Sequence, residues 1–241
     1  MKRHFIGLTD TGVVRTANQD NYFVDDELGC FFIVADGMGG HAGGQEASRI
    51  ATEEIRAHLK QYWDSPLASE VLLKEAVEKA NLGIIADQKA HPERGDMGTT
   101  AVVLIFREDK PWCAHVGDSR LYRLHNSQLE QITEDHTWVG MALKAGEINS
   151  EQAKFHPWRH VLSQCLGRED LQRIDIQELE IQPGDRLLIC SDGLTEEVPD
   201  EKIQTALTNL ESCQATAQEL IDAAKAAGGS DNITVVIVAQ E

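Results

Sequence analysis

The sequence lacks a long hydrophobic run and a paired-cysteine motif, and we expect no secretory leader. Its five cysteines are scattered through 241 residues without any CxxC spacing, so we expect neither a disulfide framework nor a cysteine-based zinc site. The apolar stretch within residues 1–10 is too short for a signal peptide, and no segment has membrane-spanning length. We therefore expect a cytoplasmic protein with reduced cysteines that does not act at a membrane.

Positive charge is also in short supply. The chain has 22 Lys and Arg against 40 Asp and Glu, a formal net charge of −18. Such a surface repels nucleic acid and anionic lipid, so we expect neither as a partner. A phosphorylated ligand would need local positive charge from metal ions or from individually placed arginines.

Repeats, low-complexity segments and linker-like stretches are missing as well. With 41% hydrophobic residues, a chain of this length can bury one large core. We expect a single domain over residues 1–241 and a monomer.

Two kinds of hydrophobic pattern alternate along the chain. Short apolar runs predict buried strands at 31–35, 101–106, 112–116, 186–190 and 233–238. Helical spacing predicts helices over 47–62 and 73–84, and a third helical region spans roughly 200–227. Because the helices come in pairs rather than after every strand, an α+β sandwich is favoured over a doubly wound parallel sheet. Residues 137–167, helical only at their front, are expected to form an insertion.

Four aspartates stand at the mouths of predicted strands, three of them next to a glycine and Asp231 two residues after one. Asp36, Asp118 and Asp192 follow apolar runs, and Asp231 precedes one. A single such aspartate is usually a turn residue. Four that converge would repel one another strongly unless cations lay between them. Oxygen ligands without His or Cys favour Mg²⁺ or Mn²⁺ over zinc, and two such ions about 3.5–4 Å apart suit phosphoester hydrolysis.

Six short motifs follow one another along the chain: 15–20 (RTANQD), 34–41 (VADGMGGH), 97–100 (MGTT), 116–120 (VGDSR), 190–194 (CSDGL) and 229–232 (GSDN). In this order they resemble the metal-dependent PPM (type 2C) serine/threonine phosphatases of bacterial type. The resemblance covers essentially the whole chain. It implies a four-layer sandwich, in which two antiparallel β-sheets are flanked by helix pairs, and a flap at about 137–167 near the active site.

The resemblance also implies a set of metal ligands. Asp36 would bridge two core Mg²⁺ or Mn²⁺ ions, and the Gly37 carbonyl would ligate one of them. Asp192 and Asp231 would complete the second site, and Asp20 would hold a metal-bound water. A third, weaker ion would lie between Asp192 and a further carboxylate, that of Asp118.

Substrate-facing groups are implied as well. Arg15 matches the arginine that grips the substrate phosphate. Met38 stands where many eukaryotic members carry a histidine that is a candidate acid for the leaving alcohol, so His41 becomes the candidate here. From the flap, His160 is a candidate substrate contact. His156 lies four residues before it, but Pro157 between them and the lack of a nearby third ligand argue against a zinc site. His136 is expected to be a structural hydrogen-bonding residue.

These observations predict an enzyme that hydrolyses phosphoserine and phosphothreonine on proteins by attack of a metal-bridging water. Residues 156–170 most resemble cyanobacterial phosphatases of the phosphorylated PII signal protein, which makes PII a candidate substrate. Two other classes of protein fit the sequence less well. An aspartyl-nucleophile hydrolase needs a second aspartate two residues after the first, where Met38 stands after Asp36. A catalytically silent pseudophosphatase acting as a binding or sensing module would typically have lost metal aspartates.

Overall fold

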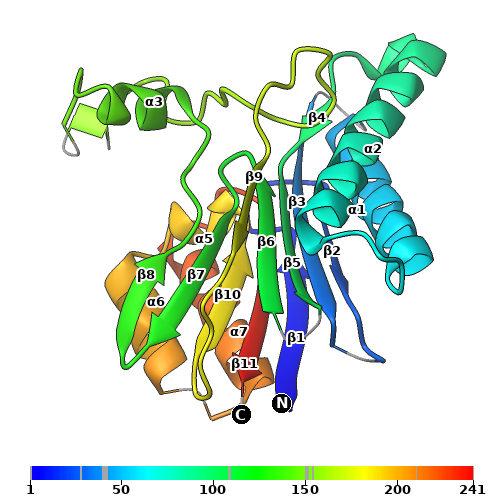
Figure 1. Ribbon diagram of the computed structural model, residues 1–241. Helices are drawn as coiled ribbons and strands as arrows, with labels where there is room; N and C mark the ends of the chain where they lie inside the picture. The colour runs from blue at the N-terminus through cyan, green and yellow to red at the C-terminus, as the bar shows by residue number, and fades with distance from the viewer. Residues whose placement is uncertain are drawn as a thin grey trace.

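The computed structural model describes residues 2–27, 29–39, 43–107, 110–149, 152–153, 155–209 and 211–240. Two antiparallel sheets face each other in this part of the chain (Figure 1). The five-stranded sheet has the order β1 (Arg3–Asp10), β11 (Ile233–Gln240), β10 (Arg186–Cys190), β7 (Arg120–His125) and β8 (Gln128–Gln131). The six-stranded sheet has the order β2 (Asp20–Val24), β3 (Phe31–Met38), β5 (Ala101–Arg107), β6 (Lys110–Val116) and β9 (Asp175–Glu178), with β4 (Gly98–Thr99) paired to β3.

Helices cover the outer faces of both sheets. The helices α1 (Gly43–Tyr62) and α2 (Ser69–Ala90) pack on the six-stranded sheet, and α6 (Asp200–Thr208) and α7 (Cys213–Ala227) pack on the five-stranded one. Shorter helices are α3 (Trp138–Lys144), α5 (Asp192–Thr195) and the 3₁₀ turn η1 (Pro92–Arg94). The predicted four-layer α+β sandwich is confirmed. No helix among the described residues combines the length and apolar character that a membrane crossing requires.

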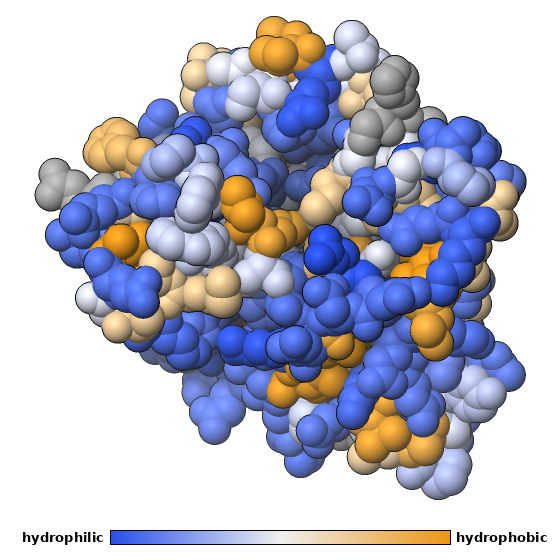
Figure 2. All heavy atoms as spheres, turned by 90° about the horizontal axis from the view of Figure 1, so that it is seen from above, coloured by the Kyte–Doolittle hydropathy of each residue, from blue (hydrophilic) through white to orange (hydrophobic). Residues whose placement is uncertain are grey.

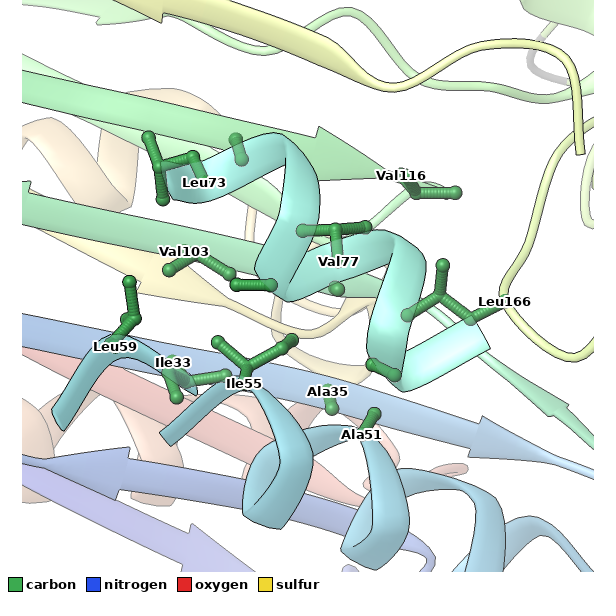
Figure 3. Close-up of a cluster of buried hydrophobic side chains, with 14 of the residues drawn as sticks. Ile33, Ala35, Ala51, Ile55, Leu59, Leu73, Val77, Val103, Val116 and Leu166 are labelled. Carbon is green, nitrogen blue, oxygen red and sulfur yellow. The ribbon is translucent and has the colours of Figure 1, made fainter. Parts of the chain in front are cut away.

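The period-two alternation of each strand sorts its side chains into separate cores. On β3, Ile33 and Ala35 face α1 and α2, whereas Phe32 and Val34 face the other sheet. Figure 3 shows the helix-side cluster, in which Ile55 of α1 and other aliphatic side chains fill the space between the helix pair and the sheet. Polar residues at one end of the sandwich follow the same alternation, so side chains such as Asp36 on β3 lie on the face between the two sheets.

The predicted central strands and the three predicted helical regions are confirmed. The stretch from 200 to 227 is two helices, because α6 ends at Thr208 and α7 begins at Cys213. The side chain of Ser212 accepts a hydrogen bond from the backbone N–H of Ala215 and so caps α7. The break lets both helices pack on the same sheet.

The insertion at 137–167 begins with α3, as its sequence pattern predicts, and returns to the core at its far end. Leu166 is fully buried in the helix-side cluster, and its backbone bridges to Thr99 of β4. A second bridge joins Thr137 to Leu162 and closes the base of the insertion. In Figure 1 this segment, called the flap below, extends from the same end of the sandwich as β4.

Candidate functional site

Two aspartates lie side by side where the sheets end. Asp20 begins β2 and pairs in register with Asp36 of β3, so both side chains lie on the inward face of the six-stranded sheet. Ser191 and Thr234 come from the opposite sheet, and their hydroxyls donate to Oδ2 of Asp20 at 2.7 and 2.6 Å. Asp20 is thus buried and held from both sheets.

The next two aspartates flank a close approach between two loops. Asp192 opens α5 after β10, and Asp231 lies two residues before β11. A side chain at Gly193 would place its Cβ 2.0 Å from the carbonyl oxygen of Asn232, so only glycine allows these loops to meet. At Gly37, a Cβ would lie 2.0 Å from the carbonyl oxygen of Gly44. Close backbone packing therefore brings the carboxylates together.

Asp118 reaches the same end from the loop between β6 and β7. The preceding Gly117 has a φ of 108°, a conformation that favours glycine. The hydroxyl of Ser119 lies 2.7 Å from that of Thr100, which accepts a hydrogen bond from the backbone N–H of Asp36. A buried polar chain thus links the loop of Asp118 to β3.

The pKa values of these carboxyl groups report their crowding. Desolvation raises the pKa of Asp20 to about 6, although the hydrogen bonds from Thr234 and Ser191 lower it. The charges of Asp192 and Asp231 add to the rise. Desolvation raises the pKa of Asp36 well above its usual range, with added repulsion from Asp20 and from the other three aspartates. The pKa of Asp118 is raised well above its usual value, and that of Asp192 is also raised, in both cases first by desolvation.

Two carboxylate oxygens indicate what the cluster fits. Oδ1 of Asp20 and Oδ1 of Asp192 are buried and accept no hydrogen bond from any residue that the structure describes. Buried polar atoms normally find a partner, and buried like charges are stable only with compensation. Oxygen ligands of this kind suit hard divalent cations, so the residues present fit Mg²⁺ or Mn²⁺.

Arg15 lies at the rim of this cluster. Its guanidinium donates to Oδ2 of Asp231 at 2.6 Å and its side chain is 49% exposed. Asn232 fixes the loop that carries Arg15: its Oδ1 accepts from the Gln19 N–H, and its Nδ2 donates to two loop carbonyls, at Thr11 and Ala17. The sequence indicated Asn232 only as part of a motif, because its partners lie more than 200 residues away.

The flap reaches the cluster through His160. Its Nδ1 contacts Oε1 of Glu196, and ligand atoms of His160, Glu196 and Asp192 lie within 4.8 Å of one another. Desolvation raises the pKa of Glu196 to about 7, with added repulsion from Asp192 and Asp231. Sequence reasoning missed Glu196, which lies in a polar turn without a recognisable motif. His156 instead stacks on Trp138 within the flap.

All the predicted ligands therefore gather at one end of the sandwich, together with Arg15 and His160. His41 lies outside the described residues. Figure 2 views the end of the molecule that carries the flap, and its surface is mainly hydrophilic, with separate hydrophobic groups.

Comparison with known proteins agrees with this geometry. A family model described as protein phosphatase 2C matches residues 13–233. The serine/threonine phosphatase stp of Listeria welshimeri is 37% identical over 234 residues, which are 95% of this chain and 93% of that protein. The serine/threonine phosphatase PstP/Ppp of Mycobacterium tuberculosis has a TM-score of 0.89 at 34% identity and 99% coverage of both chains. The catalytic domain of PstP in complex with two manganese ions has a TM-score of 0.85 at 33% identity, covering 98% of this chain and 97% of that one. This chain belongs to the protein phosphatase 2C family of serine/threonine phosphatases.

Proposed function

We propose that this chain hydrolyses phosphoserine and phosphothreonine on proteins with two core divalent cations, Mg²⁺ or Mn²⁺, and a weaker third. Asp36, Asp192 and Asp231, with the carbonyl of Gly37, would hold the core ions, and Asp20 would act from the outer sphere. Cations at this position would activate the attacking water and neutralise the phosphoryl oxygens.

One observation carries the proposal: carboxylates from both sheets converge, with raised pKa values and with two buried oxygens that accept no hydrogen bond from any described residue. A structural cluster would be expected to satisfy those oxygens with donors. The manganese found with PstP supports the same type of ion here.

Side chains around the cations would orient the water, bind the phosphate and protonate the leaving group. Ser191 and Thr234 hold Asp20 in place so that it can orient a water by hydrogen bonding. The exposed guanidinium of Arg15 can turn from Asp231 to two phosphate oxygens, because a planar fork matches that geometry. His41 stays a candidate for protonating the leaving alkoxide.

The third ion would lie between Asp118 and Asp192. The charge of Asp192 is, after desolvation, the next contribution that raises the pKa of Asp118, which supports their closeness. A site with so few protein ligands should keep several waters and bind weakly.

The test is hydrolysis of p-nitrophenyl phosphate and of a phosphoserine peptide by metal-stripped protein, with and without added Mn²⁺. Activity that appears with Mn²⁺ and disappears with excess chelator supports the proposal. Binding of the phosphopeptide without turnover would instead identify a pseudophosphatase. Trapping of a phosphoenzyme would identify an aspartyl-nucleophile hydrolase.

For the substrate, we propose phosphorylated PII signal protein, on the resemblance of residues 156–170 to cyanobacterial PII phosphatases. The kcat/KM for phosphorylated PII should exceed that for an unrelated phosphoprotein assayed under the same Mn²⁺ concentration. Equal values for the two proteins would remove PII as the preferred substrate.

A further inference from the structure

His136 lies in the loop between β8 and α3 and is 3% exposed. It contacts three separate parts of the molecule. Its backbone N–H donates to the carbonyl of Gly117 at 2.8 Å, and its carbonyl accepts from the N–H of Ser163 at the far end of the flap. Its ring lies between the N–H of Gly117 and the carboxylate of Asp175 on β9.

The two ring contacts define the tautomer. The N–H of Gly117 can only donate, so Nδ1 of His136 accepts from it, at 3.2 Å. The ring proton is then on Nε2, which donates to Oδ2 of Asp175 at 3.0 Å. Arg173 in turn donates to both oxygens of Asp175, at 2.5 and 2.7 Å. The ring is therefore oriented by a chain of hydrogen bonds that begins at Arg173.

This arrangement argues against a metal ion at the same place. Ligand atoms of His115, His136 and Asp175 lie within 4.8 Å of one another, and the two imidazole rings are 4.6 Å apart. An ion bound at Nε2 would need the ring proton on Nδ1, where it would point at the N–H of Gly117. Two donors would then face each other, so the hydrogen-bonded arrangement is favoured over metal ligation.

We propose that His136, oriented by Asp175, is a positioning residue for Asp118. Its Nδ1 accepts from the N–H of Gly117 and its backbone N–H donates to the carbonyl of Gly117, the residue directly before Asp118. These two hydrogen bonds would set where the Asp118 carboxylate lies and therefore how tightly the third cation binds. The inference rests on the proposed role of Asp118 as a ligand of that cation.

Two substitutions distinguish the contact that Nδ1 makes with Gly117 from the contact that Nε2 makes with Asp175. In His136→Asn the amide oxygen lies near the place of Nδ1 and can still accept from Gly117, but the side chain no longer reaches Asp175. In His136→Gln the terminal amide lies near the place of Nε2 and can still donate to Asp175, but no acceptor faces Gly117. A matched control is His125→Gln, because His125 contacts buried Asp185 at the opposite end of β7.

The first readout is binding of Mn²⁺ alone, by calorimetry and by electron paramagnetic resonance. We expect His136→Gln to weaken the third ion by about 10–100-fold and to retain the two core ions, which is the usual effect of losing an orienting partner. His136→Asn should stay within a few-fold of wild type, and His125→Gln should be unchanged. Equal third-ion affinity in His136→Gln and wild type would overturn the inference, as would equal losses in the Asn and Gln variants.

A second readout uses metal-stripped wild-type protein, so it depends neither on binding of the third ion nor on the folding of a variant. The imidazole ¹⁵N spectrum of metal-stripped wild type should show His136 protonated at Nε2 and bare at Nδ1, and the Gly117 amide should be protected from hydrogen exchange. A proton on Nδ1 would overturn the inference. If only two Mn²⁺ ions bind to wild type, the third-cation proposal fails, and these spectra still decide whether His136 holds Gly117. An ion kept by Asp118→Ala and lost by His115→Ala would also overturn the inference, by making the cluster a metal site.

Discussion

The carboxylate cluster and its rim are built in different ways. Asp20 and Asp36 lie on paired strands, and Asp192 follows the central strand β10 after Ser191, whereas Asp118 and Asp231 lie on loops within two residues of a strand. Arg15 and His160 lie on loops, with side chains 49% and 43% exposed. The carboxylates proposed to hold ions thus lie on strands or within two residues of one, whereas the groups proposed to meet a variable substrate lie on exposed loops and keep freedom to move.

The electrostatics of the two regions differ in the same sense. In the cluster, like charges raise the pKa values of neighbouring carboxyl groups, and two buried oxygens have no hydrogen-bond partner within the described part of the chain. At the rim, charges already have partners, as in the pair of Arg15 with Asp231. The repulsion among the cluster carboxylates therefore lies where cations are expected to relieve it. Substitutions should accordingly have larger effects in the cluster than at the rim.

The largest effect is expected for Asp36→Asn, which keeps the shape of the side chain and removes one charge. Turnover should fall roughly 1,000-fold or more, because bound cations supply several kcal/mol and each ~1.4 kcal/mol is a factor of ten. The measurement is kcat for p-nitrophenyl phosphate at saturating Mn²⁺. Asp185→Asn, which alters a buried aspartate at the opposite end of the sandwich, serves as the control and should retain activity. A loss below tenfold in Asp36→Asn would show that the cluster is not the catalytic centre.

At the rim, Arg15→Ala should weaken phosphosubstrate binding more than it slows chemistry. Hydrogen bonds to charged groups are worth about 1.5–3 kcal/mol, so KM for a phosphopeptide should rise by about 10–100-fold. Arg15→Lys should be intermediate, because it keeps the charge without the planar fork. A fall in kcat at constant KM would contradict the assigned role.

The same contrast explains what the sequence could and could not predict. The predicted strands β3, β5, β6, β10 and β11 are all interior to their sheets, where both faces are covered and the residues form continuous apolar runs. The unpredicted edge strands β1, β2, β8 and β9 have partly exposed patterns without such runs. Strand β7 was not predicted either, although it is interior, because Arg120 and Arg123 interrupt its buried residues.

Site residues divide along the same line. Aspartates at the mouths of apolar runs could be predicted, because the runs mark where strands end. Glu196 and the partners of His136 could not, because tertiary contacts alone bring them to the site. The role of Asn232 likewise depends on a loop near the other terminus.

A smaller effect is expected on the stability of metal-stripped protein as the pH changes. Aspartate has an ordinary pKa of 3.8, and in the folded protein the pKa of Asp20 is about 6. The folded state therefore binds more protons than the unfolded state between about pH 4 and pH 6, and its stability falls as the pH rises through that window. By calorimetry, Tm should be several degrees higher at pH 5 than at pH 7.5.

Two comparisons make this test specific to the cluster. Asp20→Asn should flatten the pH dependence in the metal-stripped protein, because it removes one of the groups that take up a proton. Saturating Mn²⁺ should reverse the slope, since cations bind the ionised carboxylates. If Tm of the stripped wild type instead rises from pH 5 to pH 7.5, the cluster is not under the repulsion inferred here.

The smallest effect is expected at the contact between the flap and the cluster. His160 contacts Glu196, but desolvation lowers the pKa of His160 and raises that of Glu196 to about 7, so their contact is a weak ion pair at neutral pH. Partly exposed pairs contribute about 0–1 kcal/mol, so His160→Ala should raise KM for a phosphoprotein by about fivefold at most. Hydrolysis of p-nitrophenyl phosphate should not change, because a small substrate does not extend to the flap.

In a double-mutant cycle with Glu196→Gln, the coupling energy between His160 and Glu196 should stay below about 1 kcal/mol. His156→Ala is the matched flap control, since His156 stacks on Trp138 rather than contacting Glu196. If His160→Ala, but not His156→Ala, lost activity a hundredfold on both substrates, His160 would belong functionally with the carboxylate cluster. The cluster and the rim would then not differ in the way inferred here.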